Sequence, residues 1–446
     1  MEIKNNKKTI KAWAMFDWAN SAYNLVITST IFPAYYTAIT TTKEQGDKVF
    51  FFGKSFVNTA LSNYALAVAY LIIAILTPIL TSIADYRGNK KIYMQFFTWI
   101  GALACCGLYF FKLDTLELGI FCFAIAAIGY CGGQVFYNSY LPEIATIDQQ
   151  DSVSAKGFTY GYIGSVLLQI ICFVFVLSPK TFGITDGTFP ARLSFLLVGL
   201  WWIGFAQIPF KVLPKGSLNF DKLNQQKVHN GFQELKNVWA KVQNMPLLKR
   251  FLPAFFFYSI GVQTIMLVAA NFGEKELHLG TPALISIILI IQLVAIGGAT
   301  LMSKLSEKYG NVLVLMAVVL LWIVVCIFAY FITTATQFYG LAVIVGLVMG
   351  GIQSLSRSTY SKFLPENTPD TASFFAFYDV TEKVAIVAGL FGFGFIEELT
   401  GNMRNSILFL TILFVFGLIL LFSLRLGEKN ISRNPEFYNL QNPEIK

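Results

Sequence analysis

Long apolar segments separated by short polar ones dominate this 446-residue chain. The hydrocarbon core of a bilayer is about 30 Å thick, so a helix that rises 1.5 Å per residue needs about 20 predominantly apolar residues to cross it. Twelve segments meet this requirement, and they are Ala12–Ile39, Val57–Ser82, Ile92–Phe111, Leu116–Tyr140, Gly157–Leu177, Arg192–Phe210, Phe251–Phe272, Pro282–Met302, Val312–Thr333, Gln337–Tyr360, Ala372–Glu398 and Asn405–Leu426. The pattern predicts an all-α membrane protein with twelve transmembrane helices.

The apolar segments fall into two groups of six on either side of a polar interval. We therefore expect an N-terminal six-helix bundle over residues 1–210, a cytoplasmic central loop over 211–250, a C-terminal six-helix bundle over 251–427 and a cytoplasmic tail over 428–446. Within the loop, residues 232–242 place apolar side chains on one helical face, which predicts an amphipathic helix along the inner leaflet.

Composition and charge agree with a membrane protein. Only 13% of residues are charged, against about 25% in soluble proteins. If the N-terminus is cytoplasmic, the inner segments carry 23 of the 33 lysines and arginines and the outer loops carry 8. Basic residues concentrate on the cytoplasmic side of membrane proteins, so both termini are predicted to be cytoplasmic. The net charge of +8 then reflects orientation and attraction to lipid, and we expect no nucleic-acid partner.

The chain shows no feature of a cleaved signal peptide or of a metal site. The first apolar segment is too long for a signal peptide and contains Asp17, so we expect it to remain as a transmembrane helix. All six cysteines lie inside expected spans without metal-binding or disulfide spacing, and the two histidines lie in separate loops. We expect no metal, no cofactor and a monomer, and the lack of organelle addresses favours a bacterial inner membrane.

Two short matches indicate an internal repeat. "ADYRGNKK" after the second span aligns with "SEKYGN" after the eighth, so that Asp85 matches Glu307 at an offset of 222 residues. "SYLPEIA" after the fourth span aligns with "KFLPENT" after the tenth, so that Pro142 matches Pro365 at an offset of 223. The two halves are therefore predicted to be pseudo-symmetric. Parallel repeats of this kind are typical of alternating-access transporters with a solute site between the halves.

This organisation resembles the major facilitator superfamily. Within "DYRGNKK", the residues Asp85, Arg87, Gly88 and Lys90 resemble that superfamily's signature between helices 2 and 3, although Thr81 stands where a glycine is usual. The segments "WAMFDWANSAYN", "NSYLPEIA", "GFTYGYIG", "GGIQSLSRS" and "FFAFYDVTEK" resemble the autophagy-related vacuolar effluxer branch and its bacterial relatives. The resemblance implies a secondary active transporter of a small polar solute, with an amino acid and efflux favoured. A sugar, a peptide or a drug is the alternative solute.

The same resemblance implies a gating loop. Asp85 is expected at the positive N-terminal end of helix 11, and Arg87 is expected to reach Glu143. Such contacts form when the cytoplasmic side closes and break when it opens. Glu307 would be the counterpart in the second half, close to the start of helix 5. The alternative is a topological signal with flexible charges.

Polar residues also line one face of helix 1. Asp17, Asn20, Ser21, Asn24 and Thr28 follow one another at i, i+3, i+4, i+7 and i+11, which places all five on one side of the helix. Lipid cannot satisfy such a face, so it lies either in a packing seam or along the transport path.

Helices 4 and 10 carry further polar faces. Gln134 and Asn138 are four residues apart, and so are Gln353 and Arg357. In the superfamily these helices line the central cavity, so the amides either contact solute or form interhelical hydrogen bonds. Arg357 either pairs with a solute carboxylate or extends toward the cytoplasmic interface.

Helix 11 contains three ionisable residues, Asp379, Glu382 and Lys383. Each costs about 2.5 to 3.5 kcal/mol inside a bilayer unless it is paired. Either Asp379 and Lys383 neutralise each other, or one of the two carboxylates binds a proton coupled to transport.

A multi-span membrane enzyme is the main competing class of function. Such an enzyme needs a nucleophile or metal cluster, and no HxxxH, DxD or GxSxG pattern is found. We therefore predict a transporter and not an enzyme.

Overall fold

The computed structural model describes residues 4–42, 46–214, 231–366 and 368–433, and most of them are helical. The first part contains α1 (Lys7–Ala22), η1 (Tyr23–Ile31), α2 (Phe32–Thr40), β1 (Lys48–Phe51), β2 (Lys54–Val57), α3 (Asn58–Arg87), α4 (Lys90–Gly107), η2 (Leu108–Phe110), η3 (Leu113–Thr115), α5 (Leu116–Asn138), α6 (Leu141–Ile144), α7 (Gln150–Leu177), η4 (Pro179–Phe182) and α8 (Phe189–Val212). The second part contains α9 (Gly231–Gln243), α10 (Pro246–Leu277), α11 (Thr281–Tyr309), α12 (Asn311–Phe331), α13 (Ala335–Lys362), α14 (Thr371–Thr400) and α15 (Met403–Arg433). Central-loop residues 215–230 and tail residues 434–446 lie outside the described residues.

Within the described part of the chain, ten helices are long and apolar enough to cross a bilayer. Two further expected spans differ from these ten for physical reasons. The first expected span is built from the three shorter elements α1, η1 and α2, of 16, 9 and 9 residues. The other is α14, which carries three charged residues, Asp379, Glu382 and Lys383, within its length. Twelve crossings and cytoplasmic termini stay predictions.

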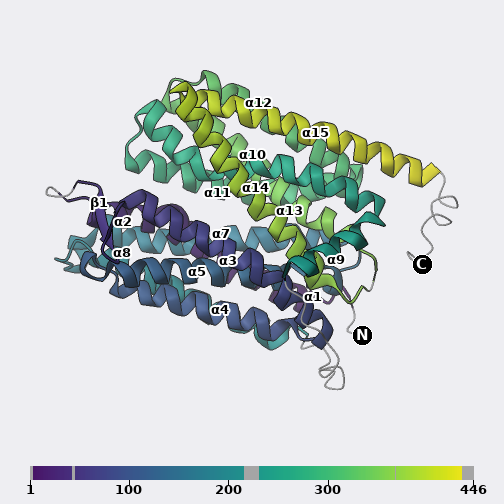
Figure 1. Cartoon of the computed structure of the whole chain (residues 1–446), viewed down its shortest axis with the longest axis horizontal. Coiled ribbons are helices and arrows are strands. Elements are labelled where there is room, and N and C mark those ends of the chain that lie inside the picture. The colour runs from purple at the N-terminus through teal and green to yellow at the C-terminus, as the bar shows by residue number, and fades with distance from the viewer. Residues whose placement is uncertain (1–3, 43–45, 215–230, 367, 434–446) are drawn as a thin grey trace.

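Two hydrophobic cores organise the helices into two bundles. One core draws on buried side chains from residues 13–213 together with Ala372 of α14. The other draws on residues 238–424 together with Val135 and Tyr162. In Figure 1 the purple and blue helices lie beneath the green and yellow ones. The molecule has the predicted fold class, a helical membrane protein with two bundles, and a single small hairpin is the addition among the described residues.

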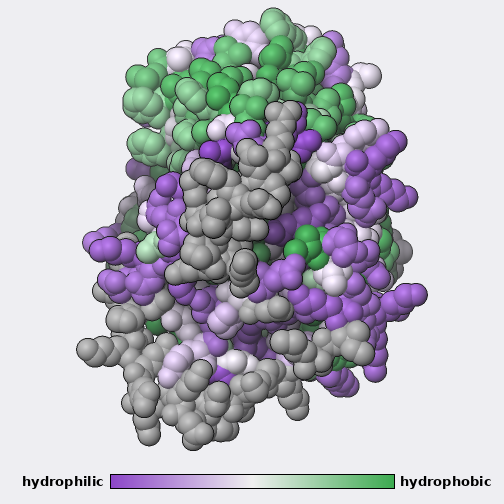
Figure 2. All heavy atoms as spheres, turned by 90° about the vertical axis from the view of Figure 1, so that its right-hand side faces the viewer, coloured by the Kyte–Doolittle hydropathy of each residue, from purple (hydrophilic) through white to green (hydrophobic). Residues whose placement is uncertain are grey.

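The bundles meet along two groups of helices. Helix α7 packs against α11 and α13, and α14 packs against α3 and α5. Helix α14 runs obliquely, so that its beginning lies near α9 and the start of α1 (Figure 1). We call this end of the molecule the terminal end: α1, α7 and α14 begin here, and α3, α5 and α13 end here. Figure 2 views this end and shows hydrophilic side chains gathered across it, with hydrophobic ones on the flank above.

The first expected span contains a wide turn at its centre. Pro33, in the first turn of α2, has no backbone N–H and interrupts the helical hydrogen-bond ladder. Just before it, the hydroxyl groups of Ser29 and Thr30 donate to the carbonyls of Asn24 and Leu25, five residues earlier. The segment η1 is accordingly π-helical, and such turns are frequent at functional sites. This widening was not predicted from the apolar pattern.

A small hairpin adds the only strands among the described residues. Strands β1 and β2 pair antiparallel, with Phe51 opposite Lys54. Phe52 and Gly53, which join them, both have positive φ angles, 47° and 76°. Two such residues are typical of the type I′ turn that matches the twist of a hairpin.

Helix α9 is the predicted amphipathic helix, and its apolar face packs against protein. It packs against α3 of one bundle and against α10 and α14 of the other. Val242 and Val238 are buried, and the Trp239 ring stacks on Phe377 of α14 with centroids 5.9 Å apart. Lys241 pairs with Asp370 at the start of α14. The position along the inner leaflet stays a prediction, and the apolar face of α9 finds partners on both bundles.

Close packing of α4 on α5 generates a first prediction. A Cβ atom added at Gly129 would lie 2.7 Å from the Phe97 carbonyl oxygen and would collide with the Gly101 backbone. Because backbone cannot move aside cheaply, Gly129→Ala is expected to lower stability by about 1 to 3 kcal/mol. Equilibrium unfolding in mixed micelles measures this loss. Gly204→Ala is the matched control, since a Cβ there meets nothing within 4 Å; equal effects of the two substitutions would contradict the packing argument.

Candidate functional site

The first contact between the bundles at the terminal end is made by Asp85. Its two carboxylate oxygens accept hydrogen bonds from the backbone N–H groups of Ala372 at 3.1 Å and Ser373 at 2.7 Å. These amides belong to the first turn of α14, whose own N-cap residue, Asp370, makes no capping hydrogen bond. Asp85 therefore caps a helix of the opposite bundle, where an anion is stabilised by the exposed N–H groups.

Gly88 turns the chain directly after this carboxylate. It ends α3 in the left-handed conformation, with φ 69°, and its amide bonds back to the carbonyls of the last helical turn. Glycine adopts this conformation without steric cost, which allows α4 to begin at Lys90. The tight turn holds Asp85 and Lys90 on the side that faces α14.

Lys90, and not Arg87, reaches Glu143. The Lys90 ammonium bonds to both Glu143 and the Thr371 hydroxyl of α14. Thr371 also donates to Glu143 at 3.0 Å. Arg87 is exposed on the last turn of α3. The expected partner of Glu143 is thus corrected, because the α3 C-terminal turn directs Lys90 toward the other bundle.

A second inter-bundle cluster surrounds Asp151 in the first turn of α7. Its side chain is fully buried and pairs with Lys362 of α13 at 2.5 Å. It also accepts hydrogen bonds from Ser306 at 2.9 Å and Asn311 at 2.6 Å. Glu307 is exposed and does not fill the role expected of it. The acid at this contact comes from α7 instead, a residue that the sequence patterns did not single out.

The third cluster is centred on Arg357 of α13, and we call it the Arg357 cluster. The guanidinium donates to the Ser154 hydroxyl at 3.0 Å, the Ser154 carbonyl at 2.8 Å and Asn138 at 3.1 Å. Its ion pair with Asp17 is longer, 3.4 Å, while Tyr137 donates to the same Asp17 oxygen at 2.7 Å. Arg357 belongs to one bundle and these partners to the other. The cluster therefore ties α13 to α1, α5 and α7.

Aromatic rings enclose the same guanidinium. Its central carbon lies 4.2 Å from the Phe158 ring centroid and 4.9 Å from that of Trp13. Gly157 makes room for it, since a Cβ there would lie 2.9 Å from a guanidinium nitrogen. The Arg357 and Asp17 side chains are each only 3% exposed. The alternative in which Arg357 extends toward the cytoplasmic interface is therefore wrong for this conformation. Protein groups surround its guanidinium.

The other polar residues predicted to face the cavity lie on α1, η1, α5 and α13. Gln134 approaches Asp17 at 3.4 Å, and Gln353 accepts a hydrogen bond from Tyr162 of α7 at 2.6 Å. Asn20 is fully buried, and neither of its amide atoms has a partner among the described residues. Asn24 lies partly buried at the wide turn η1. The structure thus joins Gln134 to the Arg357 cluster but leaves the two asparagines apart from it.

A separate group of charges lies along α14, and we call it the α14 cluster. Lys383 pairs with Asp379 at 3.1 Å and with Glu382 at 3.5 Å, while Gln263 of α10 donates to Glu382 at 2.8 Å. The Lys383 ammonium lies 5.7 Å from the ring centroid of Tyr70, on α3 of the other bundle. The cluster therefore lies between the bundles.

The charges of the α14 cluster are unequal. When ionised, two carboxylates face one ammonium. One Asp379 oxygen, Oδ2, has no hydrogen-bond partner among the described residues. Glu382 is the most accessible member, with its side chain 24% exposed, against 7% for Asp379 and 11% for Lys383. An excess negative charge and an unpaired buried oxygen make this cluster suited to binding a cation.

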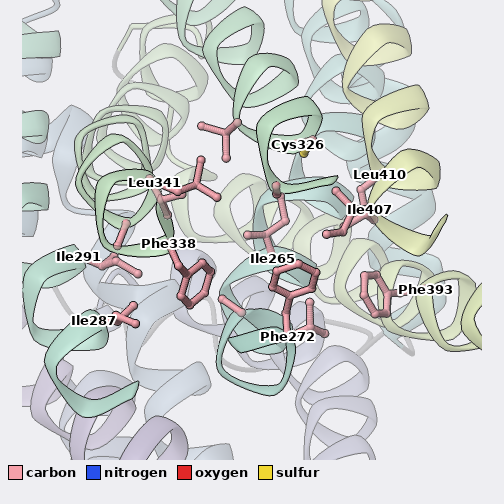
Figure 3. A pocket seen from close by; sticks show the side chains of 16 residues that line it. Ile265, Phe272, Ile287, Ile291, Cys326, Phe338, Leu341, Phe393, Ile407 and Leu410 are labelled. Carbon is pink, nitrogen blue, oxygen red and sulfur yellow. The ribbon is translucent and has the colours of Figure 1, made fainter. Parts of the chain in front are cut away.

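An apolar cavity of about 60 Å³ lies elsewhere, inside the C-terminal bundle. Figure 3 shows Phe272, Phe338 and Phe393 lining it together with aliphatic side chains. It offers no polar side chain to a solute and is smaller than the roughly 150 Å³ cavities that take up benzene. The described residues also contain no group of three or more His, Cys, Asp or Glu side chains placed to hold a metal ion.

Comparison with known proteins places this architecture in a family. The family model described as vacuole effluxer Atg22 like matches residues 5–431. YxiO of Bacillus subtilis (strain 168), an uncharacterized MFS-type transporter, is 32% identical over 420 residues, covering 94% of this chain and 95% of that protein. Autophagy-related protein 22-2 of Aspergillus oryzae is 24% identical over 442 residues, covering 79% of this chain and 72% of that protein.

Solved structures share the fold. FucP, a major facilitator superfamily transporter in an outward conformation, superposes with a TM-score of 0.69 at 14% identity, covering 94% of this chain and 98% of that one. The human organic anion transporter MFSD10 superposes with a TM-score of 0.73 at 10% identity, covering 94% and 100%. At these identities the likeness shows the fold alone. Family and fold are those of transporters and not of enzymes.

The Arg357 cluster generates a second prediction. Asp17→Asn and Arg357→Gln each leave one buried charge without its partner, which typically costs about 3 to 5 kcal/mol. The double variant is expected to lose at least 1 kcal/mol less than the sum of the single variants, because it removes both charges. A double-mutant cycle by equilibrium unfolding in mixed micelles measures the coupling. The exposed pair Lys275 and Glu397 is the control and should show a coupling close to zero; strictly additive losses at Asp17 and Arg357 would contradict the pairing.

Proposed function

The chain belongs to the vacuole effluxer Atg22-like family of major facilitator transporters, and we propose that it moves an amino acid across the membrane by alternating access. The proposal rests on two features that occur together in this molecule. Polar contacts join the bundles at the terminal end, and a cluster of ionisable residues lies between the bundles on α14. A carrier needs both a barrier that opens and a buried site that binds.

The barrier is built from contacts that water can replace. Three sets of hydrogen bonds and ion pairs join the two bundles. They are the bonds from the α14 backbone to Asp85, the ion pair of Asp151 with Lys362, and the Arg357 cluster. Rocking the bundles apart at this end breaks them without unfolding either hydrophobic core. The terminal end is therefore closed in this conformation, and its opening is the alternate state that we propose.

The excess of lysine and arginine in the segments at the terminal end supports a cytoplasmic location for that end. The conformation described is then closed toward the cytoplasm. One chain contains both bundles and the α14 cluster, so we propose a monomeric carrier. A bacterial cell membrane is the proposed location, supported by the Bacillus subtilis relative, of which 95% is matched, and the family description supports efflux.

The chemistry of the α14 cluster supports a zwitterionic solute. An amino acid has an ammonium group, which can donate hydrogen bonds to the Glu382 carboxylate. It also has a carboxylate, which can pair with the Lys383 ammonium. Glu382 is the most accessible of the three and is held by Gln263. Arg357 is fully occupied by protein groups while the terminal end is closed, so it acts in the barrier and not in solute binding in this state.

The unequal charge of the cluster also supports proton coupling. With solute absent, a proton on one carboxylate would balance the single ammonium of Lys383. The ammonium group of an arriving amino acid would pair with that carboxylate and favour its ionised form, so that the proton is released to water while the solute binds and the two move in opposite directions. Such exchange is a route to efflux driven by a proton gradient.

Transport by purified protein in liposomes tests this proposal. Saturable exchange of at least one radiolabelled amino acid is expected, and an imposed proton gradient should accelerate it. Glu382→Gln should raise KM about tenfold or more, because a charge-assisted contact is lost. Glu398→Gln, exposed on the same helix, is the matched control and should transport like the wild type. Exchange of a sugar or a drug, with no amino acid moved, would reject the solute class.

Asp85 provides a separate prediction about the barrier. Asp85→Asn removes the anion from the α14 N-terminus and should slow exchange roughly three- to thirtyfold while solute affinity changes less than twofold. Exchange rates and equilibrium binding of the same radiolabelled solute measure the two effects. Glu307→Gln should leave both unchanged, since Glu307 is exposed. Wild-type exchange by Asp85→Asn would remove Asp85 from the barrier.

A further inference from the structure

A cleft of about 440 Å³ opens at the terminal end where α9, α10 and α15 approach one another. It lies outside the contact between the bundles and outside the α14 cluster. The lining residues that matter for its chemistry are Gln243, Pro246, Lys249, Arg250, Leu420 and Ser423. The cleft therefore combines two cationic side chains with an apolar wall and polar groups at its rim.

The two cations of the cleft are available to a ligand. Lys249 and Arg250 are exposed, and neither forms an ion pair with the acidic residues that the structure describes. Arg250 donates one long hydrogen bond, 3.4 Å, to the Ser423 carbonyl. Its other guanidinium N–H groups and the Lys249 ammonium remain as donors. Two adjacent cations without a carboxylate favour a ligand with a phosphate group.

The depth of the cleft indicates where that phosphate would come from. Phe422 and Leu426 of α15 are 55% and 48% exposed, on either side of Ser423. Large exposed apolar side chains on a membrane protein face lipid chains, while Lys249 and Arg250 belong to the polar end. The cleft thus lies at the border between the two surfaces. Phospholipid phosphates lie at this border in a bilayer.

Gly427 shapes the cleft by letting Arg250 lie against α15. A Cβ atom at this position would collide with the Arg250 guanidinium. The Arg250 guanidinium therefore lies directly against α15 at Gly427, at the edge of the cleft.

From these observations we propose that the cleft binds the phosphate headgroup of an anionic phospholipid. Lys249 and Arg250 hold the phosphate, and Leu420 with Pro246 contacts the glycerol and the first acyl carbons. Gln243 ends α9, whose preceding turn holds Lys241 on Asp370 at the start of α14. A bound lipid therefore also contacts the helix that braces the barrier.

Native mass spectrometry of the full chain in detergent, titrated with dioleoyl phosphatidylglycerol or dioleoyl phosphatidylcholine, tests the proposal. The wild type should retain phosphatidylglycerol in preference to phosphatidylcholine. The double variant Lys249→Gln with Arg250→Gln should weaken that retention about tenfold or more. Lys304→Gln with Lys308→Gln is the matched control: it removes two exposed cations from the terminal end of α11 and should behave as the wild type.

Gly427→Ala keeps every charge but displaces Arg250, so it should weaken phosphatidylglycerol retention without altering the net charge. This variant also keeps the test decisive if the double variant does not fold. Equal losses in the α11 control would overturn the proposal, because they would show attraction by net charge alone. Displacement of the lipid by millimolar inorganic phosphate would overturn the assignment to lipid and leave a site for a free anion.

Discussion

The hydrocarbon core of a bilayer offers no hydrogen bonds, so polar groups that leave water must be satisfied within the protein. At the terminal end this constraint works across the two bundles instead of within each. Asp85 finds backbone N–H groups of α14, Asp151 finds Lys362, and Arg357 finds Ser154 and Asn138. If the bundles were separated, each of these polar groups would lose its partner. Closure of this end satisfies these groups, and the opening proposed above would require that water replace their partners.

The charges at these contacts are distributed in the same way between the two bundles. The acids Asp17, Asp85 and Asp151 all belong to the N-terminal bundle, and each meets a cation or backbone N–H groups of the C-terminal bundle. A strictly symmetric repeat would place an acid of the C-terminal bundle, Glu307, on the N-terminal one. Glu307 is exposed instead. The repeat therefore explains the shape of the two halves, but the barrier is polarised, with anions on one side and cations or helix N–H groups on the other.

The sequence allowed the fold to be predicted because bilayer thickness imposes a length on every span, and that length is visible in a single chain. The pairing of Asp85 with the start of α14 could also be predicted, since the resemblance includes a gating loop. Contacts set by side-chain direction could not. Arg87 and Lys90 are both basic and three residues apart, and only the turn at Gly88 decides which of them faces α14. Asp151 looked no different in sequence from Asp148, although the first is buried and the second is exposed. The wide turn η1 depends on hydroxyl groups bonding five residues back, which the apolar pattern does not show.

Helix α14 links the barrier to the buried charges. Its first turn receives Asp85 of the N-terminal bundle, its N-cap residue Asp370 pairs with Lys241 of α9, and Phe377 stacks on Trp239 of the same helix. Asp379 follows Thr371 by eight residues, about 12 Å along the axis at 1.5 Å per residue. No proline interrupts that stretch, so movement of the first turn carries the α14 cluster with it as a rigid unit. Tyr70 of the opposite bundle lies on α3, so in the proposed cycle its distance to Lys383 would change when the barrier opens. The contacts of Lys383, and the proton proposed for the α14 cluster, would then depend on the same motion that frees Asp85, which is the physical requirement for coupling a buried charge to a distant gate.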